Sequence, residues 1–202
     1  MIHPKGRSAG FTLIEMLAVI LILGILTTFL LTTMFGARTT ANEKLTEARI
    51  ANIAAAIGNF EGVTGDYPPS SQDDGIAGSG SAFNTGIEAL VTAMWGEPHD
   101  GFGLDDDFLF NTDGDQASGQ PLFEMVDMWE NPLAYMHRSD YGEKHVYLTI
   151  DEEGVEVENQ VEARKHPRTG RWANRKSFQL ISAGSDGIFG TGDDLANFDI
   201  QE

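Results

Sequence analysis

An apolar run from Phe11 to Phe35 constrains this chain more than any other part of its sequence. As a helix, the run would be about 37 Å long at about 1.5 Å per residue, enough to cross a hydrocarbon core of about 30 Å. The apolar part of a secretory signal peptide has only about 7–15 residues and precedes an Ala-x-Ala-like cleavage site, which the sequence after Phe35 lacks. The run therefore predicts a membrane helix. Because Lys5 and Arg7 precede it, we expect a cytoplasmic N-terminus, with the rest of the chain on the far side.

Glu15 is an acidic residue inside this apolar run. A carboxylate deep in a bilayer costs roughly 2.5–3.5 kcal/mol or more, so such a residue usually has a partner. The alternative is that Glu15 lies near the lipid headgroups, where its side chain reaches water. A plain signal anchor would explain the length of the run and its basic flank, but it would not explain Glu15.

The string Gly10-Phe11-Thr12-Leu13-Ile14-Glu15 resembles the prepilin peptidase signature of type IV pilins and pseudopilins. The resemblance implies that a prepilin peptidase on the cytoplasmic face cuts between Gly10 and Phe11, and that Phe11 is then N-methylated. It also implies a role for Glu15, whose carboxylate would pair with the N-terminal ammonium of a neighbouring subunit. Two charges that are each unfavourable in lipid offset one another when they are paired.

Two helices are predicted after the apolar run. Ile50, Ile53, Ile57 and Phe60 recur at helical spacing, which predicts an amphipathic helix with one buried face that continues to about residue 62. Thr85 and Glu88 have the spacing of a capping box and predict a second helix over about 86–95. This part of the chain, residues 85–91, also resembles the short second helix of major pseudopilins.

Aromatic and β-branched residues predict strands at Leu133–His137, His145–Ile150 and Phe178–Ser182. The alternation in residues 151–176 favours an extended hairpin there. The stretch 127–132 resembles an Asp-x-Trp-Gly-Asn-Pro stretch of major pseudopilins, except that Glu130 stands in place of Gly.

These elements predict an α+β, pilin-like fold, in which a long N-terminal helix packs on a small C-terminal antiparallel β-sheet. We expect a leader peptide at 1–10, a transmembrane and filament-core helix at 11–35, and a periplasmic globular domain at 36–202. The β-sheet and a calcium loop would occupy about 127–202.

The calcium loop is predicted from an acidic, glycine-rich segment between Asp186 and Asp194. Ca²⁺ takes six to eight oxygen ligands, and glycines allow the turns that wrap a chain around it. The alternative is an acidic surface loop without an ion. Residues 182–197 resemble the calcium loop of major pseudopilins, although similar strings occur in calcium repeats of other extracellular proteins. The resemblance implies the following ligands: the side chains of Asp186, Thr191, Asp193 and Asp194, and the backbone oxygens of Ala183 and Ile188.

A second acidic segment, residues 105–115, allows two interpretations. It could hold another cation, or it could be a solvated insertion. An EF-hand loop has Gly directly after its third ligand, and Gln116 stands at that position here.

Composition excludes several classes of function. The net charge of −18 disfavours a nucleic-acid partner, which needs clustered Lys and Arg. The chain has no Cys, which excludes disulfides, zinc thiolates and thiol catalysis. Its five His residues form no recognisable zinc or nucleophile motif, and no glycine-rich phosphate loop is present. We therefore expect a protein that is not an enzyme.

The resemblance implies a structural subunit, the major pseudopilin of a type II secretion system. Identical subunits would form a periplasmic filament that supports export across the outer membrane, with minor pseudopilins and an inner-membrane assembly platform as further partners. Before assembly the subunit would span the bacterial inner membrane once, with its C-terminal domain in the periplasm.

Three alternatives remain open: a type IV pilus subunit for adhesion, motility or DNA uptake; a minor pseudopilin; and, in a different class, a membrane-anchored or secreted calcium-binding module. The lack of Cys weighs against a surface pilin, because many pilins close their C-terminal region with a disulfide.

Overall fold

The computed structural model describes residues 11–71 and 81–199, with only the backbone for residues 29 and 31–35. The expected leader, including Lys5, Arg7 and Gly10, lies outside the described residues. The chain divides into two compact units, residues 1–41 and 42–202. The boundary between them falls inside helix α1, which spans Leu13–Thr64.

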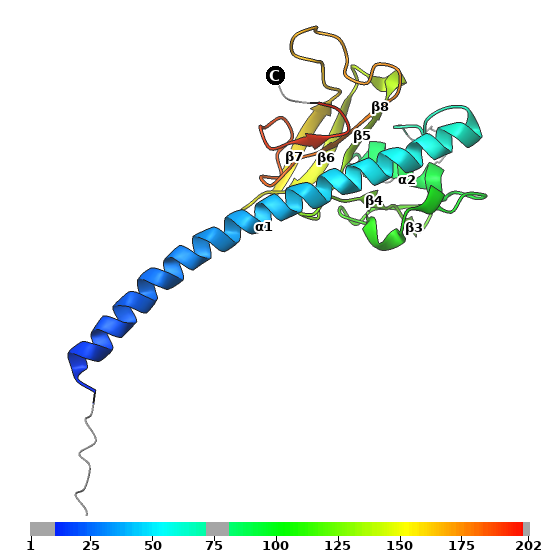
Figure 1. Cartoon of the computed structure of the whole chain (residues 1–202). Helices are drawn as coiled ribbons and strands as arrows, with labels where there is room; N and C mark the ends of the chain where they lie inside the picture. Colours follow the sequence, from blue (N-terminus) through cyan, green and yellow to red (C-terminus); the bar gives the residue numbers. More distant parts are fainter. Residues whose placement is uncertain (1–10, 72–80, 200–202) are drawn as a thin grey trace, which may run out of the picture. The chain divides into compact units, whose positions relative to one another are not determined.

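The first unit contains the N-terminal part of α1 (Figure 1). Its large apolar side chains from Phe11 to Leu26 are between 45 % and 83 % exposed. Among the residues that the structure describes, no helix is both long enough and apolar enough to cross a membrane.

The second unit begins with the rest of α1, where the predicted stripe faces the core. Ile50, Ile53, Ile57 and Phe60 are all buried. They belong to one apolar cluster with buried side chains of α2 (Thr85–Trp95) and of strands β5 (Ala134–His137) and β8 (Phe178–Ser182).

The predicted capping box of α2 is wrong. Asn84 is the N-cap residue and makes no side-chain cap. Its carboxamide instead accepts a hydrogen bond from the Leu148 N–H and donates one to Thr112. Glu88, the expected cap partner, is buried and lies against other acidic side chains. The tertiary contacts of Asn84 and Glu88 therefore replace the local motif.

The β structure consists of small antiparallel sheets, which confirms the α+β class. Strands β5, β8 and β9 (Leu195–Ala196) form a three-stranded sheet in the order β5-β8-β9. The longest pair is β6 (Lys144–Ile150) with β7 (Glu156–Glu162). The remaining elements are short: β1 (Leu109–Phe110) paired with β4 (Glu124–Met125), β2 (Gln116–Ala117) paired with β3 (Gln120–Pro121), and 3₁₀ turns at Gly101–Gly103, Asp106–Phe108 and Arg138–Asp140.

The turn before β5 shows which conformation Glu130 adopts in place of Gly. The buried carboxylate of Asp127 accepts hydrogen bonds from the N–H groups of Trp129 and Asn131, which closes the turn around position 130. Glu130 has a φ of 66°, in the left-handed region where Gly is favoured. The turn therefore keeps the geometry that suits Gly although Glu occupies it.

Candidate functional site

Glu15 closes the N-terminus of α1 within its own chain. Its Oε2 accepts hydrogen bonds from the Thr12 N–H at 2.8 Å and from the Thr12 hydroxyl at 2.7 Å. The Glu15 N–H in turn donates to the Thr12 hydroxyl oxygen at 3.3 Å. This reciprocal pattern is a capping box, and the Thr-x-x-Glu spacing in the sequence could have predicted it.

The helix that follows buries none of its side chains in the isolated chain, as far as the described side chains from Phe11 to Thr28 go. Contiguous apolar surface of this extent is rare on a soluble monomer and marks contact with a membrane or with other proteins. The predicted pairing of Glu15 with another subunit remains a prediction.

The C-terminal acidic loop brings three of its six expected ligands together. The Thr191 hydroxyl lies 3.0 Å from the backbone oxygen of Ile188 and 2.6 Å from Oδ1 of Asp193. The other oxygen of Asp193 accepts hydrogen bonds from the backbone N–H groups of Ser185 and Asp186. Burial opposes ionisation of Asp193, but the hydrogen bonds from Thr191 and Ser185 outweigh it and hold its pKa below the ordinary value.

Asp194 faces inward from the same loop. One of its oxygens pairs with Arg164 and accepts a hydrogen bond from the Gly190 N–H. The other, Oδ1, is buried and has no hydrogen-bond partner among the described residues. Burial raises the pKa of Asp194, against the opposing effect of these two partners. An orphaned buried oxygen of this kind suits a cation ligand.

The other expected ligands, Asp186 and the backbone oxygen of Ala183, form no hydrogen bond with the Thr191 hydroxyl within the described residues, although the Asp186 N–H donates to Asp193. Asp186 accepts a hydrogen bond from the Ile188 N–H, and Ala183, which directly follows β8, is fully buried. The carboxylates of Asp186, Asp193 and Asp194 do not all converge within the 4.8 Å spacing found at a different acidic group described below.

Packing against β6 fixes the C-terminal loop. The Thr149 hydroxyl donates to the backbone oxygen of Gly187 at 2.5 Å. Gly187 has a φ of 69°, and a Cβ at this position would overlap the backbone oxygen of Ile150. The side chain of Asn159, on β7, accepts a hydrogen bond from the Phe189 N–H at 3.1 Å. Hydrogen bonds and close backbone packing therefore hold the loop against β6 and β7.

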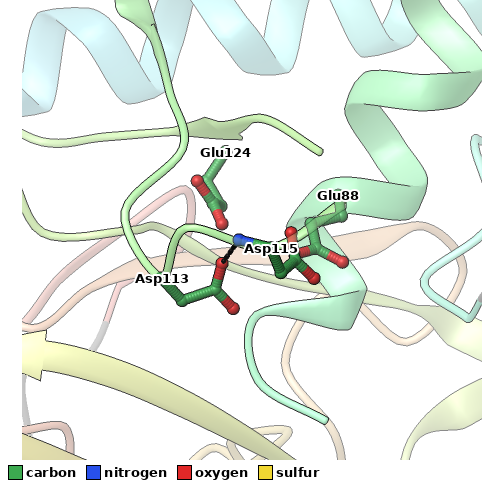
Figure 2. A group of neighbouring side chains, drawn as sticks. All are labelled: Glu88, Asp113, Asp115 and Glu124. Atoms are coloured by element: carbon green, nitrogen blue, oxygen red, sulfur yellow. Dashed lines mark hydrogen bonds between the residues drawn. The ribbon is translucent and has the colours of Figure 1, made fainter. Parts of the chain in front are cut away.

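A second acidic group joins residues that are far apart in the sequence. Glu88 of α2, Glu124 of β4, Asp113 and Asp115 each place one carboxylate oxygen within 4.8 Å of the others. Figure 2 shows the four side chains directed toward one another. Glu88 and Glu124 are almost fully buried. The acidic segment 105–115 was predicted as either a cation site or a solvated insertion. Its Asp113 and Asp115 belong to the acidic group, whereas Asp105, Asp106 and Asp107 are exposed.

Hydrogen bonds hold this group in place. The Thr112 N–H donates to Glu124 at 2.8 Å, and the Ser81 N–H donates to Asp115 at 2.6 Å. Burial, with the charges of Asp115 and Glu124, raises the pKa of Glu88 to about 9. Burial also raises the pKa of Glu124 to about 7, although the Thr112 N–H opposes the shift.

Chemically, this group must take up protons or bind a cation to relieve its mutual repulsion. Asp113, Asp115 and Glu124 form no ion pair with any Lys, Arg or His that the structure describes. Its carboxylate oxygens are ligands that a hard divalent cation prefers. Asp113 and Asp115 belong to the acidic segment, residues 105–115, whose sequence allowed a cation site as one interpretation. No sequence signal pointed to Glu88 and Glu124, because each lies on a separate element whose local pattern says nothing of the group.

Comparison with known proteins identifies the N-terminal region. Residues 5–31 match the family model described as the prokaryotic N-terminal methylation motif, which includes the expected cleavage and methylation positions, Gly10 and Phe11. No curated protein and no solved structure matches the chain.

Proposed function

From the type IV pilin-like prepilin signal that this chain carries, we propose a structural filament subunit, the major pseudopilin of a type II secretion system. One observation carries the proposal. The string Gly10–Glu15 lies inside the methylation motif and leads directly into an apolar helix. A prepilin peptidase would remove residues 1–10, and the new N-terminus at Phe11 would be methylated.

The exposed apolar helix supports a filament subunit over a soluble module. Before assembly, lipid would cover its side chains, and the subunit would span the inner membrane once. After assembly, the same side chains would pack against the helices of neighbouring subunits, where Glu15 would meet an N-terminal ammonium. Removing large apolar side chains from water stabilises such an assembly by about 25 cal/mol per Å² of buried surface.

The proposal of a pseudopilin over a surface pilin depends on the C-terminal region. The chain has no Cys, so its loops cannot be closed by a disulfide. An acidic loop held by β6 and β7 stands there instead. The globular part would then lie in the periplasm, and the filament would act in protein export.

The residues of the C-terminal loop fit a calcium ion. Thr191, Asp193 and the backbone oxygen of Ile188 already lie together. In the same loop, Asp194 has a buried oxygen with no hydrogen-bond partner in the described part of the chain. Asp186 and the backbone oxygen of Ala183 would complete the ligand set. A bound Ca²⁺ would neutralise the repulsion between these carboxylates and so stabilise the loop.

Deletion of the gene in the host bacterium tests the function. We expect exported proteins to accumulate in the periplasm of the deletion strain, and wild-type protein to restore their release into the medium. Normal export combined with lost twitching motility, adhesion or DNA uptake would instead identify a type IV pilus subunit. Loss of none of these activities would contradict both filament functions.

A further inference from the structure

The segment between β7 and β8 concentrates positive charge in an acidic protein. Residues 164–176 contain six of the 13 Lys and Arg of the chain and no Asp or Glu. The other seven Lys and Arg stand against all 31 acidic residues. Figure 1 shows this segment as the orange loop between β7 and β8. We call it the basic loop.

Five cations of the basic loop are available to a partner. Lys165, Arg168, Arg171, Arg175 and Lys176 are exposed, and none forms an ion pair within the described residues. The sixth, Arg164, is half-buried and pairs with Asp194.

The basic loop is held in one conformation. The His166 N–H donates to the backbone oxygen of Arg171, and the Ala173 N–H donates to that of Arg164, so the loop folds back as a hairpin. The carboxamide of Gln179 donates to the backbone oxygens of Arg164 and Ala173. Lys165 lies over the ring of Trp172 at 4.2 Å. Preordered cations lose less conformational entropy when a partner binds.

The other end of strand β7, away from the basic loop, is acidic. The turn that joins β6 to β7 carries exposed Glu152 and Glu153, and β7 continues with exposed Glu156 and Glu158 on one face. We call residues 152–158 the acidic turn. Strand β7 starts at the acidic turn and ends at the basic loop, which separates the two charges by about 20 Å at about 3.4 Å per residue. One subunit thus presents opposite charges at the two ends of strand β7.

We propose that the basic loop docks on the acidic turn of a second copy of this chain. This inference rests on the proposed filament. A contact between two different surfaces of the same chain is head-to-tail, and it extends into a filament when the rotation between subunits does not close a ring. The whole chain has a net charge of −18, and removal of the leader with Lys5 and Arg7 would make the subunit more acidic still. Such subunits repel one another, and this contact offsets part of that repulsion.

Engineered cysteines test the contact in the full-length chain, which has no Cys of its own. Glu153→Cys combined with Arg168→Cys should give disulfide-linked ladders on mild oxidation, because the two positions are too far apart to pair within one subunit. The matched control is Asp106→Cys with Arg168→Cys, which uses an exposed acidic position on another element and should give no ladder. Each single Cys variant should also give none.

Charge reversal provides the second measurement. The double variant Arg168→Glu/Arg171→Glu should lower the amount of filament pelleted from detergent extracts by at least about fivefold. Adding Glu152→Lys/Glu153→Lys to the same chain should restore at least half of it. Membrane-fraction monomer at the wild-type level would show that the variants insert, and a wild-type melting temperature of the detergent-extracted variants would show that they fold.

Three results would overturn the proposal. One is wild-type filaments that pellet while the 153/168 pair gives no ladder. Another is a charge reversal at Arg168 and Arg171 that Glu152→Lys/Glu153→Lys does not rescue, when the wild-type chain binds phosphatidylglycerol vesicles or duplex DNA and the reversed variant does not. The basic loop would then bind a membrane or a nucleic acid instead of a second copy. The third is the absence of both a wild-type filament pellet and a disulfide-linked ladder in the Glu153→Cys/Arg168→Cys variant. Absence of pelleted filament alone contradicts the proposed function, whereas a 153/168 disulfide in that case would still support docking of two copies.

Discussion

At the scale of single residues, Glu88 and Glu124 tie the stability of the fold to pH. Both carboxyls have pKa values above their ordinary value, about 9 and about 7, because burial and nearby carboxylates disfavour the charged form. The unfolded chain therefore binds fewer protons than the folded chain between about pH 4.5 and those values. The free energy of unfolding must then fall as pH rises through this window.

We predict that the metal-free domain, residues 36–202, is less stable at pH 8.5 than at pH 5.5 by about one to a few kcal/mol, at about 1.4 kcal/mol per pKa unit. Glu88→Gln keeps the size of the side chain and removes its charge, so it should flatten this dependence. Urea unfolding with a chelator present measures both. Asp106→Asn, at an exposed acidic position, is the control. A free energy that rises over the same range would show that these carboxyls are ionised in the folded state.

Glu130 is the second residue whose local geometry predicts a measurable effect. A left-handed conformation costs a non-glycine residue roughly 1–2 kcal/mol, and Gly loses about 0.5–1 kcal/mol of that advantage through its freedom in the unfolded chain. Glu130→Gly should therefore raise the free energy of unfolding by up to about 1 kcal/mol. Glu130→Ala, which keeps a Cβ, should give no such gain. Equal melting temperatures for the Gly and Ala variants would show that the backbone strain is no larger than the entropic cost of Gly, about 0.5–1 kcal/mol.

At the scale of elements, the C-terminal loop should respond to calcium. A ligand present at 100 times its dissociation constant stabilises the folded state by about 2.7 kcal/mol. For a domain of this size, 1 kcal/mol raises the melting temperature by roughly 2–4 °C. We predict that calcium raises the melting temperature of residues 36–202 relative to chelator, and that magnesium substitutes poorly because it requires tighter octahedral geometry.

Two variants locate the calcium effect. Asp193→Ala should remove most of the difference between calcium and chelator, whereas Glu124→Gln should preserve it if the ion is in the C-terminal loop. The reverse pattern would place the ion at the group of Glu88, Asp113, Asp115 and Glu124. Equal melting temperatures of the wild-type domain in calcium and in chelator would show that the C-terminal loop is only an acidic surface.

Elements with a strong local pattern could be predicted from the sequence. The apolar stripe on α1 is buried as its spacing predicted, and the third strand coincides with β8 because its residues suit a buried strand. The short strand pairs, such as β1 with β4, were not predicted, because two-residue strands have no period and depend on contacts distant in sequence.

The two Thr-x-x-Glu strings show the same limit at the helix ends. Thr12 and Glu15 form a capping box where no other part of the described chain competes for the Glu side chain. Glu88 does not cap α2, because burial beside Glu124 and Asp115 fixes it elsewhere. A local motif thus holds only where tertiary contacts leave its side chains available.

At the scale of the whole molecule, Glu15 should govern assembly. Glu15→Leu makes the apolar run more apolar, so membrane insertion should persist. It removes both the helix cap and the charge that would meet a neighbouring ammonium. Glu15→Gln separates these effects, because Gln can also serve in a capping box but carries no charge. We predict that both variants fractionate with the membrane and that crosslinking between adjacent subunits falls severalfold in both. Crosslinking at the wild-type level in Glu15→Gln would show that Glu15 acts through its helix cap and not through pairing with a neighbouring ammonium.

The central claim, a prepilin-type precursor that matures for assembly, is tested most directly by the intact mass of protein extracted from membranes. The methylation motif at residues 5–31 predicts a mature chain of residues 11–202 that carries one additional methyl group. A prepilin peptidase knockout should yield the unprocessed chain, residues 1–202, in the same fraction. A mature chain that begins near residue 36 would contradict the account, because the apolar helix would then be a signal that is removed before the protein reaches its site of action.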